Sequence, residues 1–282
     1  MINRGNPPPL GGERKITMPA AITSRKNRTV ADAARLVSSA SFRREQGRFL
    51  IEGARLCADA ARSGTDICTL LYTEEAAQKY EKYLSEIQKS ARQVILIHST
   101  ISKFLSDTKT PQGVFCVCGI PEGNRSLSRM DPAKSYLALE SVQDPANLGA
   151  ALRTAEALGI GGAVLGGECC DMYSPKVLRA SMGAVFRLPI FRAENMAQAV
   201  GSMNADGFAT FAAVPDREAL PVTRADFSRP CVAVVGNEGN GLRPETIRAC
   251  SISVNIPMAG RAESLNASAS AVILMWEMMR AR

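Results

Sequence analysis

Apolar and polar positions follow two different periods along the first 120 residues of the chain. Apolar residues three and four positions apart predict helices over 31–40, 52–64, 74–91 and 100–107. Apolar runs between them predict strands over 66–73, 93–99 and 112–120. Helices that alternate with strands favour an α/β unit with a largely parallel sheet, over residues 28–120.

The same alternation returns in the second half of the chain. A polar stretch rich in turn-forming residues, 121–134, is predicted to be a linker. Beyond it, six apolar runs predict strands over 135–140, 162–167, 187–193, 207–214, 230–236 and 251–258. Helices are expected between these strands, with a final helix over about 265–280. We therefore expect a second α/β domain over 135–282.

Positive charge gathers at the start of the chain, whose net charge is +7. Residues 1–30 contain one acidic residue, Glu13, and these basic residues: Arg4, Arg14, Lys15, Arg25, Lys26 and Arg28. Because residues 1–24 are also rich in Pro and Gly, we expect a basic, disordered tail over 1–27. Such an arm suits a polyanion such as nucleic acid, but it is equally typical of a solubilising tail. Charge alone leaves both interpretations open.

Composition excludes several classes of protein. There is no run of about 18 apolar residues, so we expect no membrane span, and no secretory signal starts the chain. We predict a cytoplasmic protein. The eight cysteines form no C-x-x-C pair, and His98 is the one histidine, so no metal is expected. His98 follows a predicted strand, which favours a structural role over a catalytic one.

The first of three motifs is QDPANLGAALRTA, residues 143–155. Asp144 can cap a helix whose first residue is Pro145. The helix has an apolar stripe of Leu148, Ala151, Leu152 and Ala155. Arg153 lies off this stripe. Taken alone, the motif describes an ordinary amphipathic helix with a surface arginine.

The second motif is VAVVGNEGNGL, residues 232–242, in which a buried strand runs into a glycine-rich turn. Glycines there allow backbone amides to approach a ligand closely. The G-x-x-G-x-G spacing differs from the G-x-G-x-x-G fingerprint of dinucleotide-binding folds. A tight turn from strand to helix would explain the same residues.

The third motif is IPMAGRAESLNASASA, residues 256–271. A strand is expected to end at Pro257, and a loop leads to a helix that begins with small residues. Ser264 can cap this helix, with Asn266 just inside it. Capping and close packing would explain each residue singly.

Together the three motifs resemble the SpoU family of RNA 2′-O-ribose methyltransferases, in the SPOUT superfamily. The resemblance covers residues 143–271, nearly the whole second domain. More weakly, the first domain, with its FLIEGARLCADA segment, is similar to the family's substrate-binding domain, which has an RNA-binding ribosomal-protein fold.

The resemblance implies an α/β domain with a deep trefoil knot, preceded by a smaller α/β RNA-binding domain. S-adenosylmethionine would lie in the knot loops, near Gly236, Ile256, Met258 and Leu265. The residues that match the family's polar positions are Arg153, Asn147, Glu238, Ser264 and Asn266. A homodimer with active sites at the subunit interface is implied as well.

The implied reaction places a methyl group on a ribose 2′-hydroxyl, which only RNA carries. A fixed arginine charge can clamp a phosphate, so we expect Arg153 to act as a cation. The separate first domain favours ribosomal RNA over transfer RNA. Two other functions stay open: a non-catalytic RNA-binding assembly factor with this fold, and a nucleotide-cofactor oxidoreductase. The missing dinucleotide fingerprint counts against the oxidoreductase.

Overall fold

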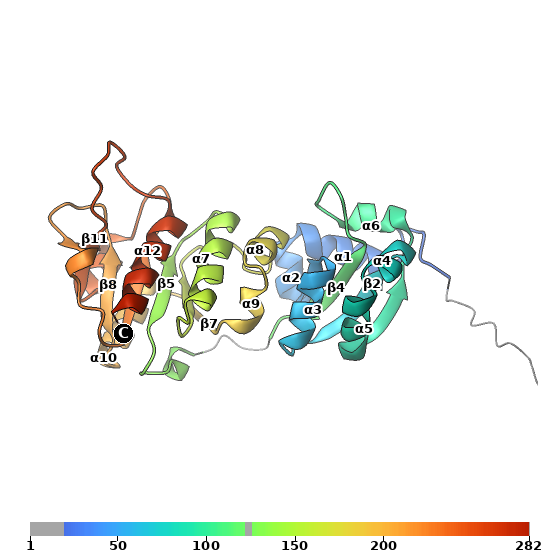
Figure 1. The fold of residues 1–282 in the computed structure, drawn as a ribbon, viewed down its shortest axis with the longest axis horizontal. Coiled ribbons are helices and arrows are strands. Elements are labelled where there is room, and N and C mark those ends of the chain that lie inside the picture. The colour runs from blue at the N-terminus through green and yellow to red at the C-terminus, as the bar shows by residue number, and fades with distance from the viewer. Residues whose placement is uncertain (1–19, 122–125, 282) are drawn as a thin grey trace, which may run out of the picture.

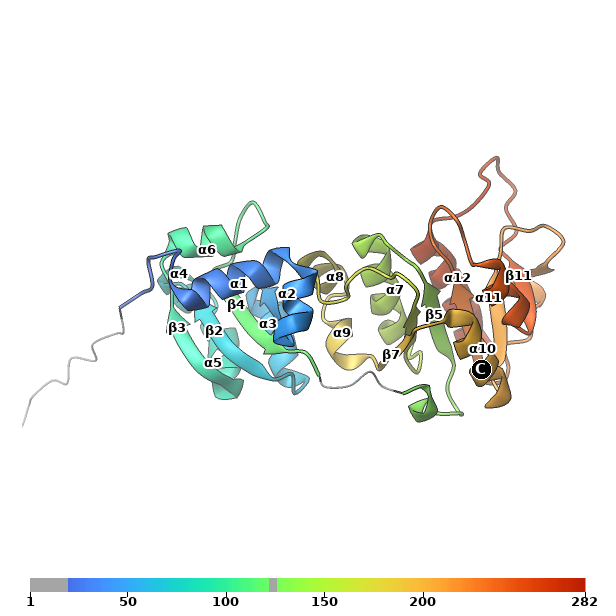
Figure 2. The same ribbon diagram turned by 180° about the vertical axis from the view of Figure 1, so that it is seen from behind.

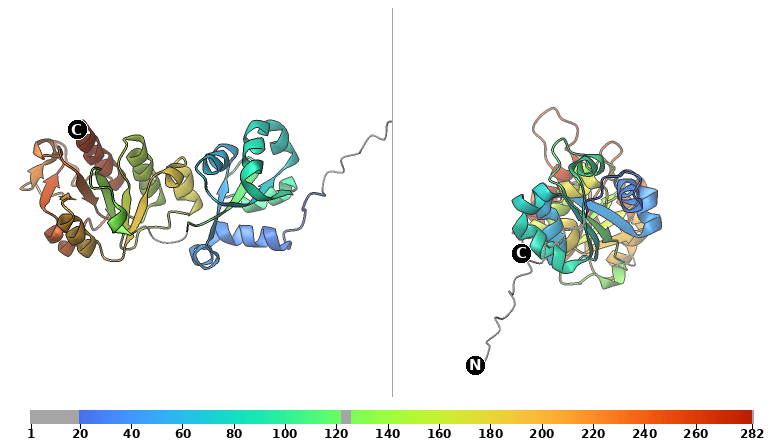
Figure 3. Two further views of the ribbon diagram at one scale, coloured as in Figure 1. Left: turned by 90° about the horizontal axis from the view of Figure 1, so that it is seen from below. Right: turned by 90° about the vertical axis from the view of Figure 1, so that its right-hand side faces the viewer.

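Two sheets organise the chain into two lobes that lie side by side along the longest axis (Figure 1). The computed structural model describes residues 20–121, here called the first lobe, and residues 126–281, the second lobe. Figure 2 shows the same arrangement from behind. Figure 3 shows that the helices near residue 180 lie on the side of the second lobe that faces the first lobe.

The sheet of the first lobe is mixed, in contrast to the largely parallel sheet that we expected. Its strand order is β1 (Arg48–Glu52), β4 (Val114–Gly119), β2 (Ile67–Tyr72) and β3 (Ala91–Leu96). β4 is antiparallel to both β1 and β2, and only β2 and β3 are parallel. The prediction was wrong because the direction of β4 depends on its pairing with distant segments, and because the pattern did not reveal β1. Its residues Phe49, Leu50 and Ile51 are all buried, so they form an apolar run without alternation.

Helices cover both faces of this sheet. α1 (Arg28–Ser38), α2 (Ala40–Gln46) and α6 (Ser99–Leu105) pack on one face. α3 (Ala54–Arg62), α4 (Glu74–Lys79) and α5 (Glu81–Ser90) pack on the other. The single helix expected over 74–91 is broken at Tyr80, whose backbone leaves the helical region (φ −122°, ψ 29°).

The last residues of the expected basic tail pack on the first lobe. Residues 1–19 of the expected tail lie outside the described residues. Ile22 forms backbone hydrogen bonds with Leu96 and His98, and Asn27 caps α1. His98 itself caps α6, which agrees with the structural role expected of it. The described part of the tail is therefore bound to the first lobe.

The sheet of the second lobe is parallel throughout its described strands. Its order is β7 (Ile190–Ala193), β6 (Ala163–Gly166), β5 (Tyr136–Glu140), β10 (Cys231–Val235), β8 (Ala209–Ala213), β11 (Ile252–Asn255) and β9 (Leu220–Pro221). The six predicted strands are confirmed. β9 was not predicted, because two residues that pair only with β11 leave no periodic signal.

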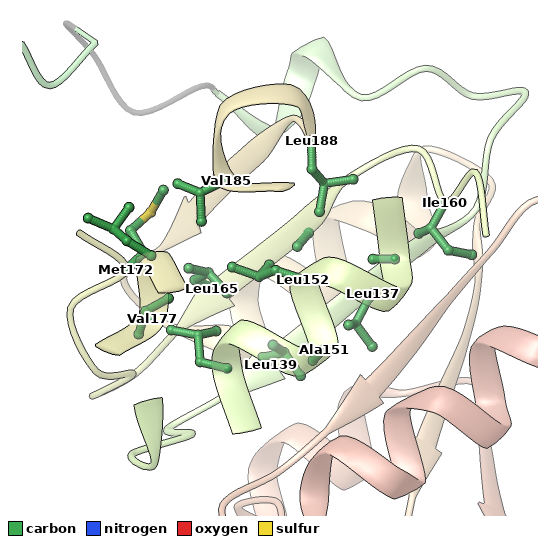
Figure 4. Close-up of a cluster of buried hydrophobic side chains, with 14 of the residues drawn as sticks. Leu137, Leu139, Ala151, Leu152, Ile160, Leu165, Met172, Val177, Val185 and Leu188 are labelled. Carbon is green, nitrogen blue, oxygen red and sulfur yellow. The ribbon is translucent and has the colours of Figure 1, made fainter. Parts of the chain in front are cut away.

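Helices also cover both faces of the second sheet. α7 (Pro145–Ala157), α8 (Pro175–Ala180), α9 (Ala184–Arg187) and α12 (Ala267–Arg280) share one hydrophobic core with the first lobe. α10 (Met196–Ala205) and α11 (Pro244–Ala249) pack on the opposite face. Short 3₁₀ turns cover Leu127–Arg129 and Val222–Arg224. In Figure 4, Leu152 of α7 lies among side chains of β5, β6 and α9.

Gly149 is required by the close packing of α7 on α8. A Cβ on Gly149 would overlap with the Cβ of Ala180 and lie 3.0 Å from the backbone oxygen of Val177. This contact gives the glycine of the first motif a structural reason that the sequence pattern did not reveal.

We expect Gly149→Ala to destabilise the protein by roughly 1–3 kcal/mol, because the two helices would have to separate. Gly201→Ala is the matched control, since its Cβ would meet nothing within 4 Å on α10. In that helix, alanine should instead stabilise by roughly 0.5–1 kcal/mol. Urea unfolding of both variants checks this prediction. Equal stability of Gly149→Ala and wild type would contradict it.

The two lobes are joined by buried contacts. Arg43 of α2 is buried, and its Nε donates to Asp171 Oδ2 at 2.7 Å across the lobe boundary. The ring of Phe49 stacks on that of Tyr173, with centroids 4.6 Å apart. Arg179 of α8 forms a two-pronged ion pair with Asp107. These contacts hold the first lobe against the second.

Candidate active site

The three motifs meet at one edge of the second sheet. β5, β10 and β11 run in the same direction, so their carboxyl ends, near Glu140, Val235 and Asn255, lie at the same edge. Open parallel sheets bind their ligands at this edge. The segments that follow the three strands, 141–144, 236–243 and 256–266, lie there.

The glycine-rich turn is closed by its own backbone. Asn237 and Gly241 exchange two hydrogen bonds of 3.0 Å, and the Asn237 side chain accepts from the amides of Gly239 and Asn240. A Cβ on Gly236 would overlap with the backbone of Gly241 and Leu242. Glycine is thus required because the turn folds back on itself. Of the two explanations left open by the sequence, ligand approach and a tight turn, the structure supports the tight turn.

A chain of hydrogen bonds joins the three motifs. Asn147 of α7 donates from Nδ2 to Glu238 Oε1 at 2.8 Å. Asn266 donates from its own Nδ2 to Asn147 Oδ1, also at 2.8 Å. Asn147 is buried, so these two bonds engage it from both sides. The structure therefore brings together Asn147, Glu238 and Asn266, one from each motif.

Glu238 is held as a carboxylate. Burial opposes its ionisation, but hydrogen bonds from Asn147 and from the backbone amides of Gln143 and Asp144 outweigh it, so the pKa of Glu238 is lowered. A lowered pKa keeps the group charged at neutral pH and makes it a weak proton acceptor. Its two oxygens organise segment 141–144 around the turn.

The caps of the two site helices differ in how well they were predicted. Asp144 caps α7 and Pro145 is its first residue, as expected. Ser264 was expected to cap the last helix, but Asn266 caps α12 by accepting from the amides of Ser268 and Ala269. Capping by Ser264 is therefore wrong, because Ser and Asn are both good caps and the spacing does not choose between them. The catalytic role implied for Ser264 by the family resemblance stays a prediction.

Other predicted residues do not join the hydrogen-bond chain, and one of them, Arg153, lies six residues beyond Asn147 on α7, away from this edge. Arg153 and Ser264 are exposed, and neither side chain makes a hydrogen bond or ion pair within the described residues. Ile256 and Met258 are half-buried, and Leu265 is 37 % exposed. The edge thus combines apolar side chains with Ser264, whose hydroxyl has no partner among the described residues.

Glu140 is a site residue that the sequence reasoning missed. It ends β5, is 2 % exposed, and accepts from the Thr246 hydroxyl at 2.7 Å and the Arg243 amide at 2.9 Å. It therefore ties the end of β5 to the start of α11, behind the glycine-rich turn. The sequence contained one signal for this residue, namely an acidic residue at the end of an otherwise apolar predicted strand.

Two kinds of feature are absent from the described residues. Within 20–121 and 126–281, no group of three or more His, Cys, Asp or Glu side chains is placed to hold a metal ion. No helix in the same residues is long and apolar enough to cross a membrane.

Comparison with known families agrees with the three motifs. A model described as the SpoU rRNA Methylase family matches residues 134–276, more than half of the chain. The chain belongs to this family. A second model, the MRM3-like substrate binding domain, matches residues 27–116 of this SpoU-family chain. The resemblance inferred from the motifs is confirmed.

Relatives of this SpoU-family chain match it over nearly its whole length. The 23S rRNA (guanosine(2553)-2′-O)-methyltransferase RlmP of Bacillus subtilis is 30 % identical over 91 % of this chain and 98 % of its own. The 23S rRNA (uridine(2479)-2′-O)-methyltransferase of Streptomyces viridochromogenes is 30 % identical, over 96 % and 95 %.

Solved structures agree with this relationship. An AdoMet-bound rRNA methyltransferase from Sinorhizobium meliloti superposes with a TM-score of 0.83 at 31 % identity, covering 93 % of this chain and 97 % of that one. The SpoU methyltransferase AviRb from Streptomyces viridochromogenes, in complex with AdoMet, gives 0.80 at 28 % identity, over 90 % and 98 %. The α/β fold with its parallel sheet is thus shared with both.

Proposed function

We propose that this protein transfers a methyl group from S-adenosylmethionine to a ribose 2′-hydroxyl of ribosomal RNA. As a member of the SpoU family it is an S-adenosylmethionine-dependent RNA methyltransferase. One observation carries the proposal most directly. Asn147, Glu238 and Asn266, one from each motif, form a single hydrogen-bonded group in a chain that matches two 23S rRNA 2′-O-methyltransferases end to end.

The sheet edge fits the cofactor by its chemistry. Half-buried Ile256, Met258 and part-exposed Leu265 offer apolar contact, and the ends of β10 and β11 offer backbone groups. We assign cofactor binding to these three residues and to the turn that begins at Gly236. When bound, the cofactor's sulfonium supplies an already reactive methyl group, so the protein must chiefly position the attacking oxygen.

The polar residues divide into two roles. Asn147, Glu238 and Asn266 are engaged with one another, so we assign them to holding the three segments in place. Arg153 and Ser264 have no internal partner among the described residues, so we assign them to the RNA. Arginine binds phosphate strongly through its planar fork of donors. Ser264 can bond a ribose hydroxyl.

The second lobe is expected to carry the deep trefoil knot of the SPOUT superfamily. After β11 the chain returns past β8, and α12 packs against both β10 and α7. Segment 256–266 makes this return. Such a path fits a C-terminal segment threaded through an earlier loop, a rare exception to unknotted topology.

We also propose a homodimer that is formed through α12. Val272 and Trp276 are 36 % and 50 % exposed and lie four residues apart, so they share one face of this helix. Large exposed apolar side chains that lie together often mark an interface. Asn266 caps the start of the same helix, so an interface along the helix would run beside the active site.

Trp276→Glu should weaken the dimer at least ~30-fold, because a central interface tryptophan often contributes 2 kcal/mol or more. Val94→Glu is the control, since Val94 is similarly exposed but lies on β3 of the first lobe. Sedimentation equilibrium of the full chain measures both. A monomeric wild type, or a Trp276→Glu variant that dimerises normally, would refute the proposal.

Ribosomal RNA is favoured over transfer RNA because both full-length relatives above act on 23S rRNA. We expect the protein to work in the cytoplasm, and its first lobe to provide most of the RNA affinity. Mapping ribose methylation in a deletion strain, nucleotide by nucleotide, tests this substrate. The proposal expects one lost methylation in ribosomal RNA. A loss confined to transfer RNA would identify the other substrate and overturn it.

A further inference from the structure

A polar hollow of about 300 Å³ lies on the sheet of the first lobe, beside α1 and α2. α1 buries Val30, Ala33 and Leu36 against this face, and part of β2 and β3 continues beyond the helix (Figure 2). The floor is a row of side chains paired in register across three strands: Val117 of β4, Thr69 of β2 and Gln93 of β3. Arg28, Gln46 and Arg48 complete its polar wall.

Thr69 is the most informative residue of the hollow. It is only 8 % exposed, yet its hydroxyl makes no hydrogen bond to any described residue. Among the described residues, every fully buried side-chain nitrogen or oxygen has a hydrogen-bond partner. Because the Thr69 hydroxyl has none, it is not fully buried, and it is accessible from the hollow. The register of β2 on β4 shifts between Ile67 and Thr69, an irregularity of the kind that redirects side chains in sheets. An accessible hydroxyl with no internal partner is free to donate to, and accept from, a ligand that enters the hollow.

The polar side chains that form the wall of the hollow also lack strong partners within the described chain. Gln46, Gln93 and Arg48 are exposed, and their side chains make no hydrogen bond or ion pair within the described chain. Arg28 has only a loose contact of 3.9 Å with Asp32. Glutamine amides both donate and accept, as the edge of a nucleic-acid base does, and arginines bind phosphate. With two arginines against one aspartate, the wall is net positive.

We propose that this hollow binds one unpaired nucleotide of the substrate RNA. The inference rests on the proposed function, because the nucleotide belongs to the RNA that the enzyme methylates. The volume is at the lower end for ligand pockets, so it suits a single nucleotide and excludes a double helix. Proteins read RNA sequence mostly from unpaired bases, through hydrogen bonds to their edges. The segment that precedes the hollow is basic, with Arg25, Lys26 and Arg28, and Arg28 lines the hollow itself. These charges favour an RNA strand over a free nucleotide, because a strand carries further phosphates.

Thr69→Val and Gln93→Ala test the hollow in the full-length protein. Valine keeps the shape of threonine, so the sheet should be preserved. The probe is 23S rRNA from a strain that lacks the enzyme. We expect each variant to weaken RNA affinity by roughly 5- to 10-fold, the loss of about one hydrogen bond. Affinity for S-adenosylmethionine and the transfer rate at saturating RNA should stay at wild-type values.

Gln88→Ala on α5 is the matched control, since Gln88 is exposed but belongs to a helix on the opposite face of the sheet. It should leave RNA affinity unchanged. Arg48→Ala should make the plot of log RNA affinity against log salt concentration less steep, by about the slope that one phosphate contact contributes.

Wild-type RNA affinity in the Thr69→Val/Gln93→Ala double variant would overturn the inference. So would displacement of the RNA by free nucleoside monophosphates at equal concentration, which would identify a site for a free nucleotide. A wild-type protein that methylates no RNA would instead refute the proposed function, so the two failures are distinguishable.

Discussion

Replacing Arg153 with alanine should slow methyl transfer by about 10²–10³-fold and leave affinity for S-adenosylmethionine nearly unchanged. Loss of one charged group that stabilises a transition state has an effect of this size. Arg153 is exposed and has no partner among the described residues, so its removal should leave the fold intact. Arg153→Lys keeps the charge but loses the planar fork, and it should retain measurable activity.

Arg153 lies six residues beyond Asn147 on α7, nearly two turns at about 3.6 residues per turn. This separation explains why one subunit does not bring it to the hydrogen-bonded group. The proposed homodimer accounts for the distance, because an active site at the subunit interface can draw on the arginine of either subunit.

We expect Arg153 to act as a fixed cation. Arginine side chains keep their proton throughout the physiological range. The lowered pKa of Glu238 makes that carboxylate a weak proton acceptor too, so we expect the hydroxyl proton to leave to water. The charge of Glu238 and the hydrogen bonds that it accepts should persist from neutral pH down to the lowered pKa of this carboxyl, and they should be lost as the pH falls through that pKa.

Single-turnover rates against pH test the role of Arg153. The control is Arg248→Ala, which removes an exposed arginine from α11 on the other face of the sheet and should retain full activity. Near wild-type transfer by Arg153→Ala would remove the residue from the mechanism. A kinetic pKa near neutrality that disappears only when Arg153 is changed would make it the proton acceptor instead.

Gly236→Ala should strongly weaken the binding of S-adenosylmethionine. The new Cβ would overlap with the backbone of Gly241 and Leu242, and backbone atoms cannot move aside as a flexible side chain can. The turn would therefore have to open, which would break the exchanged hydrogen bonds of Asn237 and Gly241.

Gly239→Ala is the matched control in the same turn. Its Cβ would meet only the Asn237 side-chain oxygen, at 3.6 Å, which is an ordinary contact. Calorimetric titration should show at least ~100-fold weaker cofactor binding for Gly236→Ala and little change for Gly239→Ala; 100-fold corresponds to about 2.7 kcal/mol. Equal affinities for the two variants would contradict the assignment of this turn to the cofactor.

Local patterns predicted much of the second lobe. Its six main strands, the cap at Asp144 and the apolar stripe of α7 all follow from periodicity and capping. These features depend on residues close in sequence, and parallel strands covered on both faces are read as plain apolar runs. The three motifs could be joined into one site only through their resemblance to a family.

Features that depend on distant contacts were not predictable in this way. The antiparallel β4, the buried pair of Arg43 and Asp171, and the packing of Gly149 against α8 each join segments with no local signal of their partner. The turn at Gly236 was located correctly, but the sequence did not decide between a tight turn and a ligand as the reason for its glycine. Its glycine is required by a backbone five residues later in the same turn.

The most direct test of the central claim is to follow the methyl group itself. The full-length protein would be incubated with methyl-labelled S-adenosylmethionine and ribosomal RNA from a deletion strain, and the RNA digested to nucleosides. The account predicts label in a single 2′-O-methyl nucleoside, at one position that becomes unreactive when its 2′-hydroxyl is replaced by hydrogen. Label in a base, or cofactor binding without any transfer to ribosomal RNA, would contradict it.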